Sequence, residues 1–272
     1  MDENLIITIL SENTVERRGL KAEHGLSFYI NYKGKEYLFD TGQGLILLSN
    51  AEKLNIDLKN IDTVFLSHGH DDHTGGLKQI LDLNPKINIA AHKNIFLKKY
   101  KKTKSGVEFI GIELEKSDIK NFIDISDKSK VINDIYSTGT VQTKNNDYIK
   151  EKYIIKKDNN KLIDNFHDDI SIYFKTQKGL VILLGCSHKG VINILKHIRK
   201  KEPGERIRAI LGGMHLKHSS IEDVKRIIKY LDEINFELLV PIHCTGRKPA
   251  MMMKDQFGDR VKLASVGDEF KF

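Results

Sequence analysis

The chain has 272 residues, of which 40% are hydrophobic and 30% are charged, so it can bury a sizeable core. Its two cysteines are too few for a disulfide scaffold, and no apolar run reaches the length of a membrane span, which excludes those two classes of protein. The formal net charge of +7 favours an anionic substrate over nucleic acid, because much of the excess lies in the lysine run at residues 98–104, and such runs are usually solvent-exposed. The first residues lack the basic region of a secretion signal, and we therefore expect a cytoplasmic protein without membrane contact.

The first forty residues predict three strands. Residues 5–10 alternate enough for a first strand, and residues 25–32 predict a second. A turn at residues 33–35 leads into a third strand at residues 36–39, as in a hairpin. This strand runs directly into the turn Asp-Thr-Gly at residues 40–42, which places a carboxylate at a strand end.

A helix and a buried strand precede the most informative stretch of the chain. Residues 45–54 carry apolar side chains at helical spacing, and residues 63–66 form a short apolar run that predicts a strand. Residues 67–76 then read Ser-His-Gly-His-Asp-Asp-His-Thr-Gly-Gly. The alternative interpretation is a solvated polar turn, but the pattern His-x-His-x-Asp-His after a strand and before a helix is highly specific for a metal site.

The side chains in this stretch suit metal ligation. Neutral imidazole nitrogen and carboxylate oxygen bind zinc, iron and manganese, and the pairs His68/His70 and Asp72/His73 could face two different ions. Thr74 could cap the helix that follows, because apolar residues recur after it at helical spacing. The sequence therefore predicts a metal site between a strand end and a helix start.

The middle of the chain, at about residues 96–169, is more polar and less regular. Its candidate strands are residues 107–110, 131–136 and 152–155, separated by charged turns. We interpret it as a variable insertion or lid within a single domain that spans residues 1–272. Long structured connections often shape a binding site, so substrate specificity is expected to lie here.

In the second half of the chain, each of three predicted strands is followed by a segment that contains a histidine. Strands are predicted at residues 180–184, 207–211 and 236–240, with amphipathic helices between them. The segments that follow these strands read Gly-Cys-Ser-His, Gly-Gly-Met-His-Leu and Pro-Ile-His-Cys-Thr-Gly, and they supply His188, His215 and His243. Scattered core histidines are the alternative for any one of them, but they do not explain the repeated placement.

The pattern His-x-His-x-Asp-His resembles the signature of the metallo-β-lactamase superfamily. Together with the Asp-Thr-Gly turn and the three histidine segments, it is similar to the group of 7,8-dihydropterin-6-methyl-4-(ribofuranosyl)-aminobenzene 5'-phosphate synthases within that superfamily. The resemblance spans nearly the whole chain and is weakest at residues 96–169. It implies an α+β four-layer αββα sandwich, in which two sheets pack together with helices outside.

For the first metal, the resemblance implies His68 and His70 as ligands. Many members take a further histidine from a Thr-Pro-Gly-His motif, whereas residues 137–141 here read Ser-Thr-Gly-Thr-Val and contain none. We expect His188 to be a ligand, either in place of this histidine or in place of a bridging residue; an incomplete first site is the alternative. Cys186 stands where members of the superfamily have an aspartate that bridges two metals, so a thiolate ligand or a buried structural cysteine are both open.

For the second metal, the resemblance implies Asp72, His73 and His243 as ligands. Asp40 is similar to a supporting carboxylate, which would fix a ligand or the loop backbone by hydrogen bonds. Whether Cys244, which follows His243, contacts a metal is left open.

Three residues are expected to contact the substrate. His215 could bind a metal or donate a hydrogen bond to a phosphate or carboxylate, and substrate contact is the favoured interpretation. Thr245 and Arg247 stand at the start of a helix, where backbone amides and a cation could hold an anion.

The resulting prediction is a metal-dependent hydrolase that uses metal-bound hydroxide on a small, phosphate-bearing or otherwise anionic substrate. One or two divalent ions are expected, zinc ahead of iron or manganese, with Asp72 and His215 as catalytic residues. A synthase that uses the same metals in a transferase reaction is one alternative, and a metal-binding or redox module without hydrolysis is another. The sequence leaves the oligomeric state open and is compatible with a homodimer.

Overall fold

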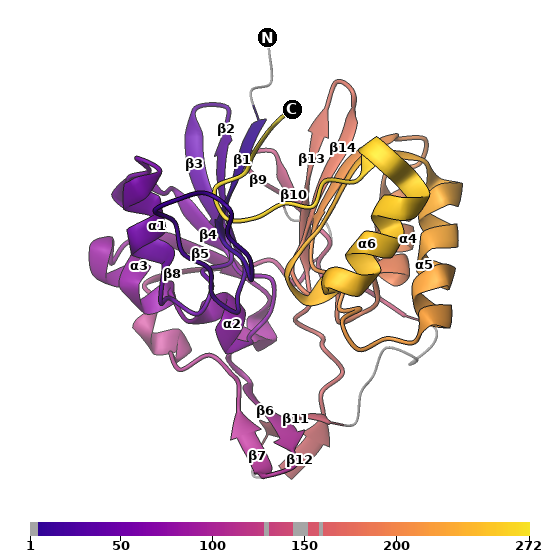
Figure 1. The fold of residues 1–272 in the computed structure, drawn as a ribbon. Coiled ribbons are helices and arrows are strands. Elements are labelled where there is room, and N and C mark those ends of the chain that lie inside the picture. Colours follow the sequence, from indigo (N-terminus) through magenta and orange to yellow (C-terminus); the bar gives the residue numbers. More distant parts are fainter. Residues whose placement is uncertain (1–4, 128–130, 144–151, 158–159) are drawn as a thin grey trace.

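The computed structural model of the protein describes residues 5–127, 131–143, 152–157 and 160–272, and it contains two large sheets that face one another (Figure 1). The first sheet contains, in spatial order, β17 (Glu269–Lys271), β1 (Leu5–Ser11), β2 (Ser27–Tyr32), β3 (Lys35–Phe39), β4 (Thr63–Phe65), β5 (Asn88–Ala91) and β8 (Asn121–Asp124). The second contains β16 (Phe236–Pro241), β15 (Ile207–Gly212), β14 (Gly179–Leu184), β13 (Ser171–Thr176), β10 (Ile135–Ser137) and β9 (Val131–Ile132).

Helices cover the outer face of each sheet (Figure 1). The first half contributes α1 (Leu47–Lys53), α2 (Asp71–Thr74) and α3 (Leu77–Leu83), and the second contributes α4 (Val191–Lys201), α5 (Ile221–Ile234) and α6 (Arg247–Phe257). The predicted four-layer αββα sandwich is therefore confirmed. Among the described residues, every helix is too short or too polar to cross a lipid bilayer.

The core follows from the alternation of apolar side chains along the strands. Leu5, Ile7 and Ile9 of β1 point between the two sheets, where they join Val181 and Leu183 of β14 in one buried cluster. The intervening residues of β14 pack instead against the helices of the second half. This strand is buried along its whole length, as its unbroken apolar sequence predicts.

The parallel parts of both sheets determine where the loops meet. Strands β3, β4, β5 and β8 run parallel to one another, and so do β14, β15 and β16. Because the strands are parallel, the carboxyl ends of neighbouring strands, and the segments that follow them, lie at the same edge of each sheet. The segments after β4, β14, β15 and β16 carry the histidines that the sequence singled out.

A third, four-stranded sheet lies apart from the sandwich (Figure 1). It contains, in spatial order, β12 (Asn160–Ile163), β11 (Tyr153–Lys157), β6 (Lys98–Thr103) and β7 (Gly106–Phe109). It belongs to the segment 96–169 that was predicted to be an insertion or lid. Parts of that segment, at residues 128–130, 144–151 and 158–159, lie outside the described residues.

Three local predictions were wrong. The single strand expected at residues 131–136 is the hairpin β9–β10, because Asn133 and Asp134 turn the chain with φ values of 49° and 64°. Thr74 does not cap α3, since it ends the preceding helical turn α2, and its Oγ1 donates to the carbonyl of His70. The lysine run is not solvent-exposed throughout, because Lys99 is only 1% exposed.

Candidate metal centre

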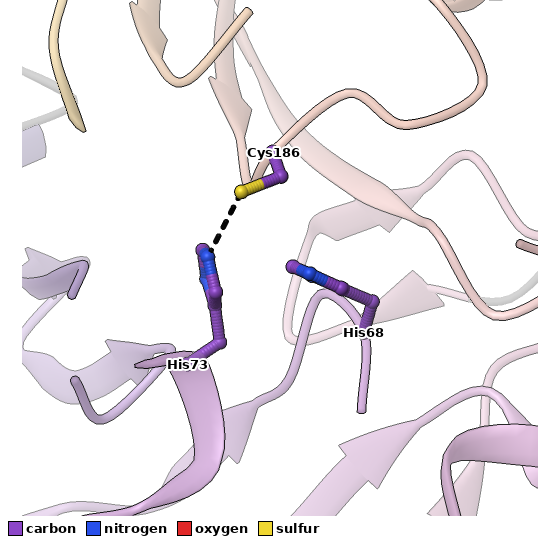
Figure 2. A group of neighbouring side chains, drawn as sticks. All are labelled: His68, His73 and Cys186. Atoms are coloured by element: carbon purple, nitrogen blue, oxygen red, sulfur yellow. Dashed lines mark hydrogen bonds between the residues drawn. The ribbon is translucent and has the colours of Figure 1, made fainter. Parts of the chain in front are cut away.

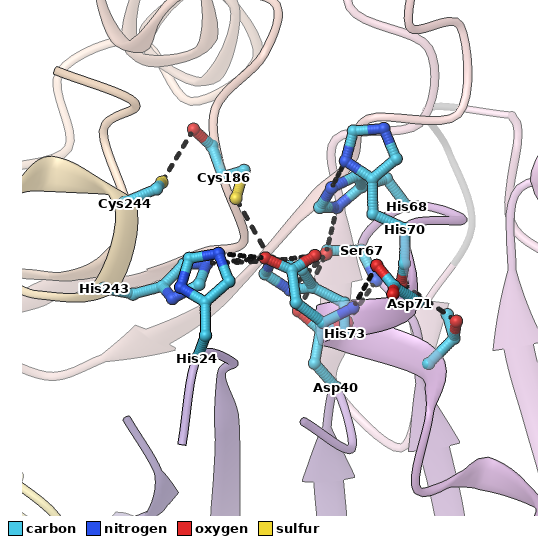
Figure 3. Close-up of polar contacts among 12 residues, drawn as sticks. His24, Asp40, Ser67, His68, His70, Asp71, His73, Cys186, His243 and Cys244 are labelled. Atoms are coloured by element: carbon cyan, nitrogen blue, oxygen red, sulfur yellow. Dashed lines mark hydrogen bonds and ion pairs between the residues drawn. The ribbon is translucent and has the colours of Figure 1, made fainter. Parts of the chain in front are cut away.

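The edge at which the parallel strands end gathers ten side chains from distant parts of the chain. Figure 3 shows most of them, converging from the first half and from the second half. The loop after β4 and helix α2 supply His68, His70, Asp72 and His73. The segments after β14, β15 and β16 add further residues, which are Cys186, His188, His215, His243 and Cys244, and the loop before β2 adds His24.

Three histidines form the first cluster, which we call the three-histidine group: His68, His70 and His188. Each offers a ring nitrogen, and these atoms lie within 4.8 Å of one another. Burial lowers the pKa of His68 and His188 well below the usual value and that of His70 to about 3, so all three rings are neutral. Buried Nε2 atoms of His70 and His188 have no hydrogen-bond partner among the described residues. Uncharged nitrogens with free lone pairs are what a divalent ion requires.

A second cluster, the Asp72 group, consists of Asp72, His73 and His243. The Nε2 atoms of His73 and His243 lie 3.2 Å apart, and Oδ2 of Asp72 lies 3.4 Å from Nε2 of His243. His24 also approaches, with its Nε2 3.4 Å from Oδ2 of Asp72. The sequence analysis did not single out His24, since no spacing pattern marks it.

Hydrogen bonds from outside the cluster orient both imidazoles of the Asp72 group. Nδ1 of His73 lies 2.6 Å from Oδ2 of Asp40, and Nδ1 of His243 lies 2.8 Å from Oδ1 of Asn13. The buried carboxylate of Asp40 also accepts hydrogen bonds of 2.7 Å from the backbone N–H and the hydroxyl of Ser67. The backbone N–H of His243 donates to Glu12.

These hydrogen bonds test whether the Asp72 group fits a metal ion. A carboxylate and an amide oxygen only accept, so Nδ1 must donate in both His73 and His243. In the neutral rings the two Nε2 atoms, 3.2 Å apart, then point lone pairs at each other. A cation between them, next to the carboxylate of Asp72, removes this conflict, and the residues therefore fit a divalent ion.

Without a metal ion, a proton on His73 can also relieve the conflict between the two facing Nε2 lone pairs. Burial by itself would lower the pKa of His73, but the negative charges of Asp40 and Asp72 raise it to about 9. The positive charge on His73 in turn holds the pKa of Asp72 well below its usual value despite burial. Metal binding at the Asp72 group therefore has to displace a proton, whereas binding at the three-histidine group does not.

Cys186 lies between the two groups. Figure 2 shows its thiol directed at the ring of His73, with Sγ 3.1 Å from Nε2, and His68 close to both. The three ligand atoms lie within 4.8 Å of one another. Burial raises the pKa of the Cys186 thiol well above its usual value, so deprotonation there requires a compensating cation.

Cys244 and His215 extend the cluster on the side of Cys186. Sγ of Cys244 contacts the carbonyl of Cys186 at 3.6 Å and accepts a hydrogen bond of 3.3 Å from the backbone N–H of His215. His215 adopts a left-handed backbone conformation, with φ of 53°, and its ring centroid lies 4.3 Å from that of His188. Its buried Nδ1 has no hydrogen-bond partner among the described residues.

A cavity of about 450 Å³ opens next to these side chains. Its lining includes residues of the cluster, Tyr153, Lys101 and Lys152 from the region of the four-stranded sheet, and Lys217. Tyr153 lies close to the cluster, with its ring centroid 5.6 Å from that of His70. The cavity thus combines metal-binding side chains with several cations.

Two predicted substrate contacts do not reach this cavity. The hydroxyl of Thr245 is buried and accepts a hydrogen bond from the backbone N–H of Met214, and the side chain of Arg247 is exposed. Neither residue is among those that line the cavity. His215 does line it, next to His188.

The sequence analysis did not identify several residues that contact the histidines of the cluster. Glu12 and Asn13 follow β1, and their position at a strand end was the available signal. Tyr153 and Phe166 lie in the irregular middle segment, where no periodic pattern marks them. The ring of Phe166 is stacked on that of His188, with centroids 4.2 Å apart and planes 4° from parallel.

The fold and the cluster define an αββα protein (Figure 1) with a candidate metal centre. Residues 20–197 match the family model described as the metallo-β-lactamase superfamily, and the chain belongs to this superfamily. It is 32% identical, over 92% of its length and 90% of the relative's, to the 7,8-dihydropterin-6-methyl-4-(β-D-ribofuranosyl)-aminobenzene-5'-phosphate synthase of Methanocaldococcus jannaschii. The expected resemblance to this group is confirmed.

Solved structures show the same fold. Tm1679, described as a metal-dependent hydrolase of the β-lactamase superfamily, superposes with a TM-score of 0.85 at 27% identity and covers 98% of this chain and 99% of its own. A metallo-β-lactamase fold protein of Bacillus subtilis, YhfI, matches with a TM-score of 0.64 over 100% of both chains, at 13% identity. The latter likeness concerns the fold alone.

Proposed function

We propose that the protein is a metal-dependent hydrolase of a small, anionic, phosphate-bearing molecule. The observation that carries this proposal is the cavity beside the cluster, whose lining combines His70, His188 and Asp72 with Lys101, Lys152 and Lys217. A phosphate group in this cavity would have both cations and the candidate metal ligands among its neighbours. The similarity to Tm1679, described as a metal-dependent hydrolase, supports the reaction type.

The two groups would each hold one divalent ion, with Cys186 between them. The three-histidine group offers three nitrogens, and the Asp72 group offers two nitrogens and a carboxylate. This donor set favours zinc, with iron and manganese as the other candidates. When bound, such ions lower the pKa of water and polarise the electrophilic centre of a substrate.

The residues of this chain have distinct tasks in the proposed reaction. The carboxylate of Asp72 accepts a proton, and the ring of His215, which lies beside that of His188, donates toward the oxygen on which negative charge develops. Burial raises the pKa of Tyr153, so its hydroxyl stays protonated and can also donate. Lys101, Lys152 and Lys217 hold the anionic part of the substrate.

The four-stranded sheet is the proposed lid over this site. It carries Lys101 and Tyr153, so its position selects which molecules reach the cluster. Substrate specificity would then lie within residues 96–169, as the sequence analysis expected.

A transferase reaction is the second candidate function, because the relative from M. jannaschii is a synthase of a dihydropterin aminobenzene phosphate compound. In that reaction the same ions would assist the condensation of a pterin diphosphate with an aryl phosphate. Release of pyrophosphate from a pterin substrate distinguishes the synthase from the hydrolase. A metal-binding or redox module without hydrolysis would release neither pyrophosphate nor the products of hydrolysis.

The first test is metal content by elemental mass spectrometry, together with hydrolysis of p-nitrophenyl phosphate esters and carboxylic esters. We expect two equivalents of zinc, iron or manganese in the wild type, and the loss of one in His188→Ala. His92→Ala is the matched control, because this buried histidine binds Asn94 and Thr140 instead of the cluster. A wild type without metal, or with one ion that is indifferent to His188→Ala, would contradict the proposal.

Cys186→Ala, measured in the same way, tests the thiol. If Cys186 is a structural residue, the variant keeps both ions. If its thiolate binds metal, the variant loses affinity for one or both.

A further inference from the structure

Lys99 is buried in the base of the four-stranded sheet between two aspartates. Its Nζ lies 2.6 Å from Oδ2 of Asp164 and 2.9 Å from Oδ1 of Asp168. The three side chains are at most 4% exposed. Burial alone would lower the pKa of Lys99, but the two carboxylates raise it above its usual value, so the lysine is charged. We call these three residues the Lys99 clamp.

The first carboxylate of the clamp holds the loop that carries His68 and His70. Oδ2 of Asp168 accepts a hydrogen bond of 2.9 Å from the backbone N–H of Gly69, the residue between the two histidines. This loop is packed tightly, since a Cβ on Gly69 would lie 2.3 Å from the carbonyl oxygen of Ile95 and 3.3 Å from Cε of Lys99. Both the charge and the aliphatic stem of Lys99 therefore act on the loop.

The second carboxylate holds the residue that packs on His188. Oδ1 of Asp164 accepts a hydrogen bond of 2.7 Å from the backbone N–H of Phe166, which adopts a left-handed conformation with φ of 49°. The stacked ring of Phe166 covers one face of the His188 imidazole. The ammonium group of Lys99 lies 5.5 Å from the centroid of the same phenyl ring.

The clamp also joins both ends of the four-stranded sheet. Lys99 lies in β6, through which the chain enters this sheet, and Asp164 directly follows β12, through which it leaves. Their ion pair ties the entry and the exit together. Asp168 then connects this junction to the metal loop.

Stability alone does not account for such an arrangement. A buried ion pair costs desolvation and is often replaced by apolar residues without loss of stability. The contacts of the Lys99 clamp end instead on Gly69 and Phe166, which position all members of the three-histidine group. Within the part of the chain that the structure describes, no hydrogen bond of the clamp reaches a member of the Asp72 group.

We propose that Lys99 is a positioning residue, which fixes the three-histidine group through Asp168 and Asp164 and couples it to the four-stranded sheet. The inference rests on the proposed function insofar as the three histidines hold an ion. It assigns the clamp no contact with substrate.

The first experiment measures hydrogen exchange of the metal-free protein by mass spectrometry, for the wild type and Lys99→Met. We expect exchange at least about tenfold faster in Lys99→Met, confined to residues 66–70, 164–168 and 186–189. Lys98→Met is the matched control, because this neighbouring lysine pairs with Glu115 at the surface. Unchanged exchange in these segments, or an equal increase throughout the protein, would overturn the proposal.

The second experiment separates the two groups by metal titration against a chelator with zinc. In a His243→Ala background, which retains the three-histidine group, Lys99→Met should lower zinc affinity by about 10- to 100-fold. In a His188→Ala background, which retains the Asp72 group, it should leave the affinity unchanged. An equal effect in both backgrounds, or none in either, would overturn the proposal.

If Lys99→Met does not fold, Asp168→Asn replaces it in the hydrogen-exchange experiment. The amide oxygen can still accept from Gly69, so the same exchange pattern is expected with a smaller increase, and the absence of that pattern contradicts the clamp. Because exchange is measured without metal, the two ideas fail separately. A wild type that binds no metal contradicts the proposed function, whereas metal binding with unchanged exchange in the variants contradicts the clamp.

Discussion

The two halves of the candidate metal centre use the same kind of ligand and support it differently. In the three-histidine group Phe166 is stacked on His188, the Lys99 clamp holds the backbone at Gly69, and the side-chain partner of His68 outside the group is the hydroxyl of Ser67, 2.9 Å from Nδ1. In the Asp72 group each imidazole donates to an oxygen acceptor, Asp40 or Asn13. Burial leaves the rings of the three-histidine group neutral, whereas Asp40 and Asp72 stabilise a proton on His73 in the Asp72 group.

One edge of the sandwich can therefore carry two metal sites that differ in their affinity for protons. An imidazole in an apolar environment loses its affinity for protons but keeps its lone pair for a metal. An imidazole between two carboxylates binds a proton and a metal competitively. The two groups should therefore differ in their response to mutation and to pH.

The largest expected effect comes from removing one ligand of either group. His68→Ala should lose the ion of the three-histidine group, and His243→Ala should lose the ion of the Asp72 group, each leaving one equivalent of metal. Phosphoester hydrolysis should fall by roughly 10³-fold in both, the scale of losing one electrostatic stabiliser of the transition state. Elemental mass spectrometry and steady-state kinetics measure this. If either single variant loses both ions, the two groups do not bind metal independently.

The next effect is the pH dependence of metal affinity. Because the pKa of His73 is about 9, a proton must leave before the Asp72 group binds an ion. Its affinity should therefore rise by about tenfold per pH unit between pH 7 and 9 and level off above the pKa. The three-histidine group should show no such rise, because burial lowers the pKa of its rings well below this range.

Zinc titration of His188→Ala and His243→Ala at several pH values isolates the two groups for this purpose. Parallel pH profiles in the two variants would show that the proton on His73 is not what distinguishes them.

The smallest expected effect comes from removing the charge of Asp40 next to His73. Asp40→Asn keeps the shape of the side chain but removes the charge next to His73, so metal affinity at the Asp72 group should fall by about 10- to 100-fold at high pH. The pH dependence should also weaken, because the pKa of His73 loses its first source of elevation. Ser67→Ala removes no charge, only a hydroxyl that contacts both Asp40 and Nδ1 of His68, so it should leave the pH dependence in place. An Asp40→Asn variant with wild-type affinity would contradict this role.

Much of the fold could be predicted because its signals are local. The short apolar sequences of β14 and β1 each predict a strand within a few residues, and both strands are almost wholly buried. The hairpin at Asn133 and Asp134 was missed because two non-glycine residues adopt left-handed conformations there. Lys99 was missed because its burial depends on Asp164 and Asp168, which lie 65 and 69 residues away.

The sequence by itself determined the superfamily, the strand ends that carry histidine, and the local ligand set of residues 67–73. These features depend on residue type and spacing within one or two elements. The tertiary structure decided that His24 approaches Asp72, that Phe166 stacks on His188, and that Thr245 does not line the cavity. The partners of His243, for example, lie about 230 residues away in the chain. Only the packing of the two sheets, which aligns the carboxyl ends of their parallel strands, brings such residues within reach of one another.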